Sequence, residues 1–290
     1  MEADAAPRLP GSPAREFAYS RRDFNRVRDL IYAHAGISLN DSKTEMVYSR
    51  LAKRLRATGH REFGAYLDIL SDDGHPEWEH FVNALTTNLT EFFREAHHYP
   101  VLAQHARQSS SRPYRVWSAA CSTGEEPYSL AMTLCEAFQS DDPPVDILAT
   151  DLDTQVLEKG ASGIYEMDRV EGVDATHLKR FFLKGAGGRS GLARLRPNIR
   201  KLVRFQQLNF HAAQWGVNGK FDAIFCRNVL IYFDKPTQHR VLRRLSEYLA
   251  PNGLFFAGHS ESLLHAADVF VPIGKTVYRA AGARGRLPHG

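Results

Sequence analysis

The chain has 290 residues, 43% of them hydrophobic and 24% charged, and its formal net charge at pH 7 is +4. This length is enough for one large and one small domain, and the balance of residue types is typical of a globular protein. The apolar runs are too short to cross a bilayer, and the acidic residues Glu2 and Asp4 argue against a secretory signal. The three cysteines form no CxxC pair, which argues against a zinc site and a disulfide framework. We therefore expect a cytoplasmic protein without direct membrane insertion, and the mild positive charge favours an acidic partner.

The N-terminal part of the chain is predicted to be a small all-α domain at 16–87, after a disordered tail at 1–15 that is rich in Ala and Pro. Apolar residues at helical spacing indicate its first helix, and Gly36 is a typical signal for the end of that helix. The apolar positions of this first helix are Phe24, Val27, Leu30 and Ile31.

The second helix of this domain, which follows Asp41 and Ser42, carries a basic face. Arg50, Lys53 and Arg54 cluster there within two turns. Most such runs are solvated surface, and the alternative is a docking surface for an acidic protein.

From residue 114 onward, short apolar runs alternate with helical stretches. This βαβ alternation is typical of an α/β domain, with a mostly parallel sheet that helices cover on both faces. We place this domain at 114–280, between a linker with one helix at 88–113 and a loose tail at 281–290. The predicted strands are 114–119, 145–150, 202–206, 221–226, 253–258 and 275–280.

The segment 162–200, between the second and third predicted strands, is too long for a plain crossover. It contains a Gly-rich stretch with Gly185, Gly187 and Gly191. We interpret the segment as a small inserted β-subdomain, for which an antiparallel hairpin is one form. The alternative for the glycines is an ordinary flexible loop.

Several chemistry-bearing residues lie where the predicted strands end. The first strand turns through small residues up to Gly124 into a helix, and Asp151 ends the second strand. Ligands of open α/β sheets bind at the carboxyl ends of strands, and a carboxylate there can accept hydrogen bonds from ribose hydroxyls. The alternative for Asp151 is the N-cap of the next helix. The missing GxGxxG motif counts against NAD more than against S-adenosylmethionine, which has no pyrophosphate.

Five segments, in order along the chain, resemble the CheR family of chemotaxis receptor methyltransferases. The resemblance covers about residues 20–280. It implies an α/β fold in which a Rossmann-like S-adenosylmethionine methyltransferase domain with a small inserted β-subdomain follows an all-α domain. The five segments are 86–95, 119–129, 149–153, 225–233 and 258–262.

The resemblance also implies an activity. Members of this family transfer a methyl group from S-adenosylmethionine to glutamate side chains of methyl-accepting chemotaxis receptors, which forms methyl esters in adaptation and leaves S-adenosylhomocysteine. It further implies a set of cofactor contacts on this chain. Phe210 stands where family members often have Leu, which would matter little if its contact is mainly through the backbone. The implied cofactor contacts are Asn88, Thr90, Arg94, Glu125, Asp151, Asn209, Phe210, Arg227 and Asn228.

The expected reaction needs alignment more than proton transfer. A glutamate side chain is already ionised at neutral pH, so the nucleophile needs no general base. We assign Arg94 and Tyr232, as a hypothesis that the resemblance supports, to holding the substrate carboxylate in line with the methyl group. The alternatives are a surface salt bridge for Arg94 and a core aromatic for Tyr232.

No metal is required for this displacement, and we expect none. Four histidines could suggest a metal site, but their spacings match no known ligand pattern. These four residues are His97, His98, His259 and His265.

The expected partner is the cytoplasmic domain of a chemoreceptor. The positive charges of Arg50, Lys53 and Arg54 would attract a glutamate-rich helix of the receptor and steer the encounter between the two proteins. In some family members a receptor's C-terminal peptide adds a strand to the inserted subdomain, and Gly185, Gly187 and Gly191 match the glycines of that peptide-binding type. We expect a monomer, because no heptad pattern is visible.

Two other functions remain open at this point. A nucleic-acid or amine methyltransferase commonly has an Asn/Asp-Pro-Pro-Tyr/Phe motif after the fourth strand, where this chain has Arg227-Asn228-Val229-Leu230-Ile231-Tyr232. That difference, with the lack of aromatic residues among the basic ones, argues against nucleic acid. The second alternative is an adaptor that binds the cofactor without transferring its methyl group.

Overall fold

The computed structural model describes residues 15–282, which fall into two compact units. The smaller unit comprises the described residues up to Ile31 and 39–85, and the larger unit comprises 32–38 and the chain from Thr86. The predicted tails at 1–15 and 281–290 lie almost entirely outside the described residues. Between residues 15 and 282, no helix has the length and apolar character needed to span a membrane.

The smaller unit is helical, as the spacing of apolar residues predicts. Its core is formed by buried side chains such as Phe24, Leu51, Tyr66 and Phe81. Helix α1 ends at Ala35 because Gly36 adopts a φ of 71°, which favours glycine. Its helices are α1 (Arg21–Ala35, which continues into the larger unit), η1 (Asp41–Lys43), α2 (Thr44–Thr58), α3 (Phe63–Asp68), η2 (Ile69–Ser71) and α4 (Glu77–Leu85).

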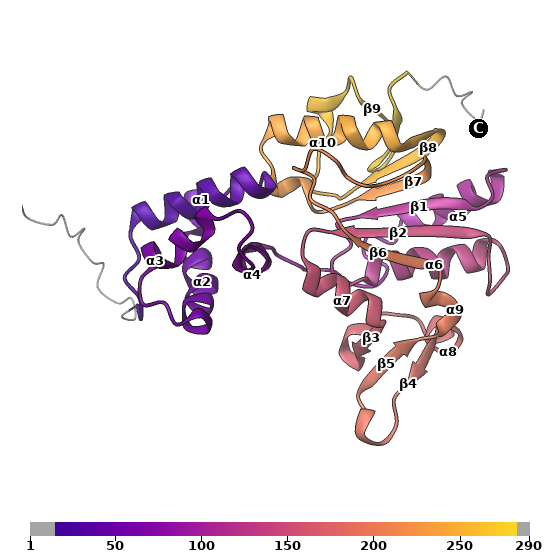
Figure 1. Ribbon diagram of the computed structural model, residues 1–290. Coiled ribbons are helices and arrows are strands. Elements are labelled where there is room, and N and C mark those ends of the chain that lie inside the picture. The colour runs from indigo at the N-terminus through magenta and orange to yellow at the C-terminus, as the bar shows by residue number, and fades with distance from the viewer. Residues whose placement is uncertain (1–14, 283–290) are drawn as a thin grey trace, which may run out of the picture. The chain divides into compact units, whose positions relative to one another are not determined.

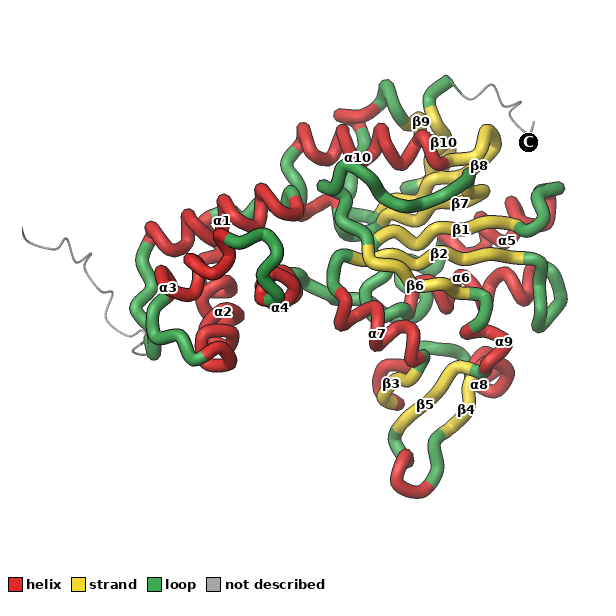
Figure 2. The backbone as a smooth tube through the Cα atoms, viewed as in Figure 1, coloured by secondary structure: helices red, strands yellow, loops and turns green. Residues whose placement is uncertain are grey.

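A seven-stranded sheet is the centre of the larger unit (Figures 1 and 2). The strand order is β6-β2-β1-β7-β8-β10-β9; the first five are parallel, and β10 and β9 are antiparallel. Its strands are β1 (Tyr114–Ala119), β2 (Val145–Asp151), β6 (Val203–Gln207), β7 (Phe221–Cys226), β8 (Leu249–Ala257), β9 (Phe270–Gly274) and β10 (Val277–Ala280). The helices that accompany the sheet are α5 (His98–Gln108), α6 (Glu125–Ala137), α7 (Thr154–Ser162) and α10 (Lys235–Tyr248).

Two features of this sheet differ from the sequence prediction. Strand β8 begins at Leu249 rather than at 253. The sequence prediction missed its first residues because Pro251 and Gly253 are typical of turns. In the structure they lie within the strand, where its register with β7 shifts. Strand β9 was not predicted. It contains Pro272 and lies at the end of the strand order, where the missing N–H of a proline costs no ladder hydrogen bond.

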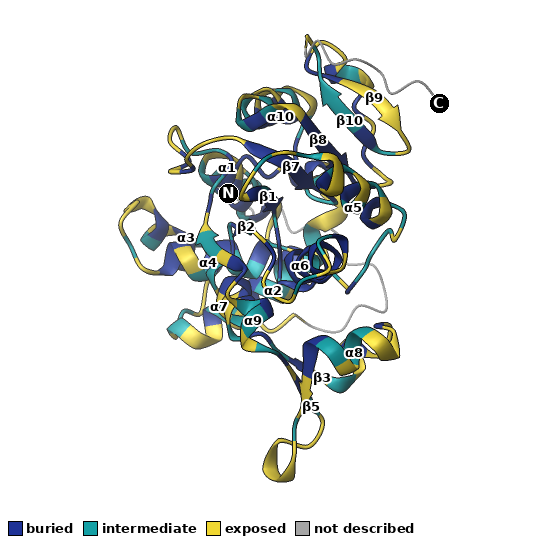
Figure 3. Ribbon diagram, turned by 90° about the vertical axis from the view of Figure 1, so that its right-hand side faces the viewer, coloured by how far each residue is buried: buried dark blue, intermediate teal, exposed yellow. Residues whose placement is uncertain are grey.

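The inserted segment forms a three-stranded antiparallel sheet rather than a single hairpin, and stands apart from the larger sheet (Figure 1). The strand order is β3-β5-β4, and the loop between β4 and β5 is exposed (Figure 3). The elements of the insertion are β3 (Ile164–Glu166), η3 (Met167–Val170), α8 (Ala175–Phe181), β4 (Phe182–Lys184), η4 (Gly187–Arg189), β5 (Leu192–Leu195) and α9 (Pro197–Arg200).

The strand order reverses between β1 and β7, since β2 lies on the far side of β1 and β8 on the far side of β7. In open α/β sheets a ligand site forms outside the carboxyl ends of the strands at such a switch point. We therefore expect a ligand site at the loops that follow β1, β2 and β7.

Candidate functional site

Backbone strain is concentrated around this switch point. Ala120 and Ser122 after β1 and Asn228 after β7 have positive φ angles of 72°, 49° and 59°. Phe93 and Glu95, in the linker before α5, have φ angles of 55° and 56°. Such conformations are rare for residues with a side chain, and they cluster at functional sites.

The carboxylate of Asp151 lies at the end of β2, facing the loop after β1. Its Oδ2 accepts a hydrogen bond of 2.8 Å from the Ser122 N–H, and its Oδ1 accepts one of 3.0 Å from the Asp153 N–H. Burial raises the pKa of Asp151 to about 6, against the effect of these N–H donors.

Asp153, two residues further on, has the capping role that was the alternative for Asp151. Its side chain accepts hydrogen bonds from the N–H groups of Gln155 and Val156 at the start of α7. Its other oxygen accepts hydrogen bonds from Asn88 Nδ2 at 2.8 Å and from the Thr86 hydroxyl at 3.0 Å. Asp153 therefore fixes Asn88, one of the predicted cofactor contacts, against the loop that follows β2.

Glu125 begins α6 and is fully buried. It accepts a hydrogen bond of 2.6 Å from the Thr123 hydroxyl and forms an ion pair with Arg169 of the insertion. Arg169 also donates to the carbonyl of Thr90 at 2.8 Å. One side chain of the insertion thus connects two predicted cofactor contacts, a role that sequence reasoning missed.

Arg227, after β7, is buried and holds the linker turn that carries Arg94. Its Nη2 donates to the Arg94 carbonyl at 2.6 Å, and its Nη1 lies 3.0 Å from Glu126 Oε2. A second carboxylate, that of Glu95, lies 3.4 Å from Nη2. Two carboxylates therefore offset the buried guanidinium charge, as a buried charge requires.

Glu261 anchors the loop that leads from Asn228 to Tyr232. Its carboxylate accepts hydrogen bonds of 2.6–2.9 Å from four backbone N–H groups. Burial raises the pKa of Glu261, although the four donors favour its charged form. The donors belong to Asn228, Val229, Leu230 and Gly258.

The remaining predicted site residues lie close to the same edge of the sheet. Asn209 donates to the His34 carbonyl at 2.7 Å and accepts from the His211 N–H at 2.8 Å. The Phe210 ring is buried against Trp215, with 5.4 Å between ring centroids. Tyr232 ends the short helix η5 (Leu230–Tyr232) and is partly exposed.

These groups fit a cationic, hydroxyl-rich nucleoside better than a pyrophosphate. Asp151 and Glu125 supply carboxylates, which can accept hydrogen bonds from hydroxyls and attract a positive charge. The guanidinium of Arg227 is already paired with carboxylates. This set of acceptors fits S-adenosylmethionine, a sulfonium cation with a ribose.

The residues predicted for receptor docking differ from one another in their contacts within the smaller unit. Arg54 makes a two-point ion pair, at 2.8 and 2.9 Å, with Glu77, whose side chain is 6% exposed. Arg50 donates to the Ala84 carbonyl at 3.3 Å, and Lys53 is exposed. Arg54 is thus engaged within the smaller unit.

The three glycines of the insertion lie in the loop between β4 and β5. Gly187 and Gly191 have φ angles of 58° and 91°, and a Cβ on Gly185 would lie 2.0 Å from the Arg189 carbonyl oxygen. The shape of this loop therefore requires glycine at these positions.

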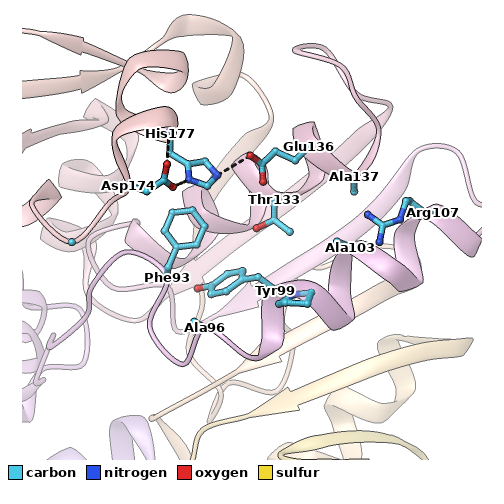
Figure 4. A pocket seen from close by; sticks show the side chains of 12 residues that line it. Phe93, Ala96, Tyr99, Ala103, Arg107, Thr133, Glu136, Ala137, Asp174 and His177 are labelled. Carbon is cyan, nitrogen blue, oxygen red and sulfur yellow. Dashed lines mark hydrogen bonds and ion pairs between the residues drawn. The ribbon is translucent and has the colours of Figure 1, made fainter.

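A cavity of about 470 Å³ lies elsewhere in the larger unit, where the linker, α5, α6 and the insertion meet (Figure 4). Phe93 and Tyr99 line it, and His177 forms ion-pair contacts with Asp174 and Glu136. Its lining includes none of the predicted cofactor or substrate contacts, so this cavity is separate from the strand-end site.

Comparison with known proteins assigns both units. The model of the CheR methyltransferase all-alpha domain matches residues 22–86, and the model of the CheR methyltransferase SAM-binding domain matches residues 88–279. The chain is 53% identical over 269 residues to chemotaxis protein methyltransferase 2 of Pseudomonas aeruginosa, which covers 92% of this chain and 95% of that protein. It is 51% identical over 262 residues to the chemotaxis protein methyltransferase of Escherichia coli strain K12, which covers 90% of this chain and 91% of that protein. The chain therefore belongs to the CheR family of S-adenosylmethionine-dependent chemotaxis methyltransferases.

Proposed function

We propose that this chain methylates glutamate side chains on the cytoplasmic domain of chemoreceptors, forming methyl esters. The names of its relatives support a role in chemotaxis. The observation that carries the proposal is the bond from buried Arg227 to the Arg94 carbonyl, because it fixes Arg94 next to the strand ends. The contacts of Glu261 fix the loop of Tyr232 in the same way.

S-adenosylmethionine supplies an electrophilic methyl group when it is bound. Asn88, Glu125, Asp151 and Asn209 would hold it, with Asp151 accepting hydrogen bonds from the ribose hydroxyls. Thr90, Phe210 and Asn228 would contribute further contacts.

The guanidinium of Arg94 and the hydroxyl of Tyr232 would donate hydrogen bonds to the substrate carboxylate. That carboxylate is ionised at neutral pH, so the chain has to orient it and keep water away rather than remove a proton. Arg94 Nη1 donates to the carbonyl of Leu89 at 3.0 Å, which leaves its other N–H groups available for a substrate.

A transfer assay with labelled cofactor tests the proposed substrate class. The chain is mixed with chemoreceptor-containing membranes, and base-labile label is followed on the receptor band. Label on the receptor that is lost when the receptor's acceptor glutamates are changed to alanine supports the proposal. Label on added RNA instead would contradict it, and cofactor binding without any transfer would favour the adaptor.

We also propose that a C-terminal receptor peptide adds to the insertion as an extra strand. In the described part of the chain β4 pairs with β5 alone, so its outer edge offers unpaired N–H and C=O groups. The loop of Gly185, Gly187 and Gly191 follows this edge directly. Such tethering would raise the local concentration of receptor without changing the chemistry.

A further inference from the structure

A cluster of side chains of the metal-ligating type begins at Glu95, the residue after Arg94, and its members are not among the residues assigned above to methyl transfer. The ligand atoms of Glu95, His97 and His98 lie within 4.8 Å of one another. The loop after β8 brings a fourth group, because His259 Nε2 lies 3.6 Å from Glu95 Oε2. The His97 ring lies close to both other rings, with centroid distances of 4.1 Å to His98 and 4.9 Å to His259.

Two buried polar atoms in this cluster make no hydrogen bond to any residue that the structure describes. They are Glu95 Oε2 and His98 Nδ1, and their side chains are 9% and 0% exposed. These atoms lie 3.9 Å apart. Polar atoms that are buried without a hydrogen-bond partner are rare and costly, and a cation between these two would satisfy both.

The ring of His98 is oriented to offer Nδ1 as a ligand. Its Nε2 lies 2.7 Å from the Thr276 hydroxyl, a contact that orients the ring and turns Nδ1 toward Glu95. A hydrogen bond at one ring nitrogen commonly fixes the other as a metal ligand.

Two positive side chains oppose a cation here. Arg227 Nη2 lies 3.4 Å from Glu95 Oε2, and the positive charge of Lys275 interacts electrostatically with His97. Arg227 uses Nη1 for Glu126, at 3.0 Å, and Nη2 for the Arg94 carbonyl, at 2.6 Å, and Glu95 Oε2 makes no hydrogen bond to a described residue. We therefore expect weaker binding than at a closed structural zinc site.

We propose that Glu95, His97, His98 and His259 bind a divalent transition-metal ion of the zinc type. Imidazole nitrogen with one carboxylate oxygen is a ligand set that zinc and cobalt share, and the set contains no sulfur. The His259 side chain is 46% exposed, so an ion can enter from solvent. The ion lies outside the methyl-transfer step, which needs no metal.

Cobalt titration of the full, untagged chain tests this site directly. After removal of metals with a chelator, Co²⁺ is added and its ligand-field absorption is followed, and Zn²⁺ is then added in competition. We expect one ion per chain and displacement of Co²⁺ by Zn²⁺. The variant His97→Ala/His259→Ala should bind Co²⁺ at least about tenfold more weakly.

The matched control is His239→Ala, since His239 contacts a single carboxylate, that of Asp268 at 2.9 Å, and lies outside the cluster. Its Co²⁺ affinity should equal that of the unchanged chain. Binding of S-adenosylhomocysteine, measured in each variant, separates loss of the metal site from loss of the fold. Absence of Co²⁺ absorption in the unchanged chain, or equal affinity in the double variant, would overturn the proposal.

Discussion

Asp151 is the residue at which ionisation and the proposed cofactor binding are most closely connected. Its pKa is raised to about 6, so the folded chain holds this proton more tightly than the unfolded chain. Its contribution to the free energy of unfolding therefore falls as pH rises from about 4 to about 6. The ionised carboxylate is the better acceptor for hydroxyls, so cofactor affinity should rise over the same pH range.

Calorimetric titration with S-adenosylhomocysteine at about pH 5 and about pH 7.5 measures this dependence. We expect tighter binding at the higher pH for the unchanged chain. The Asp151→Asn variant should bind S-adenosylhomocysteine weakly, with little change in affinity between the two pH values. An equal pH dependence in the variant would show that another group is responsible.

The Glu261 carboxylate is expected to be the main anchor of the loop from Asn228 to Tyr232. In Glu261→Gln, an NH₂ group would face N–H donors and leave some without an acceptor. The free energy of unfolding should fall by about 2–4 kcal/mol, with weaker cofactor binding. Urea unfolding measures this loss, and Glu247→Gln on the exposed face of α10 is the control. A Glu261 variant as stable as the control would contradict the anchoring role.

The sequence placed candidate residues at the strand ends but did not show which contacts hold them there. Asp151 could be predicted because it ends an apolar strand. Arg169, Glu126 and Glu261 could not. Apart from Gly258, the partners described for them lie 31 or more residues away, and neither periodicity nor turn chemistry encodes such pairing. The resemblance included Glu261 within a matching segment without giving its role.

At the scale of elements, strands were predicted best where burial is continuous. The bounds of β1 and β7 agree with the apolar runs, since both strands are almost entirely buried. β9 and the three strands of the insertion are short and partly exposed, so their patterns are weak. These strands form through pairing with neighbouring strands, and a local sequence pattern does not predict such pairing.

The loop between β4 and β5 provides a test of peptide binding. In Gly185→Ala the new Cβ would lie 2.0 Å from the Arg189 carbonyl oxygen, so the loop has to rearrange. Gly188→Ala is the matched control, since a Cβ there would meet nothing within 4 Å. Fluorescence anisotropy with a labelled receptor C-terminal peptide should show at least about tenfold weaker binding for Gly185→Ala only.

Transfer to a receptor without its C-terminal peptide should be the same in both glycine variants. Equal peptide affinity in the two variants would remove the insertion as the binding site. Reduced transfer to the truncated receptor in Gly185→Ala would instead indicate a wider structural effect.

At the scale of the whole molecule, we expect receptor docking to depend on charge on α2. Arg54 is unsuitable for testing it, because breaking its pair with buried Glu77 should destabilise the smaller unit by about 3 kcal/mol. Exposed Lys53 is the better target. Lys53→Glu should raise KM for receptor at low salt, with cofactor affinity unchanged, because like charges then oppose encounter.

The control for docking is Arg22→Glu, the reversal of an exposed charge on α1 of the same unit. Both variants change net charge in the same direction by the same amount, so only position differs. Equal effects would assign the change to net charge rather than to a docking surface.

The most direct test of the central claim is the rate of methyl transfer in Arg94→Ala. The rate of a single turnover onto chemoreceptor membranes and the affinity for S-adenosylhomocysteine are measured on the same preparations. Because Arg94 is proposed to align the substrate carboxylate, the rate should fall about 100-fold or more, with a smaller loss of cofactor affinity. A variant that binds the cofactor and methylates the receptor at a near-normal rate would contradict the account.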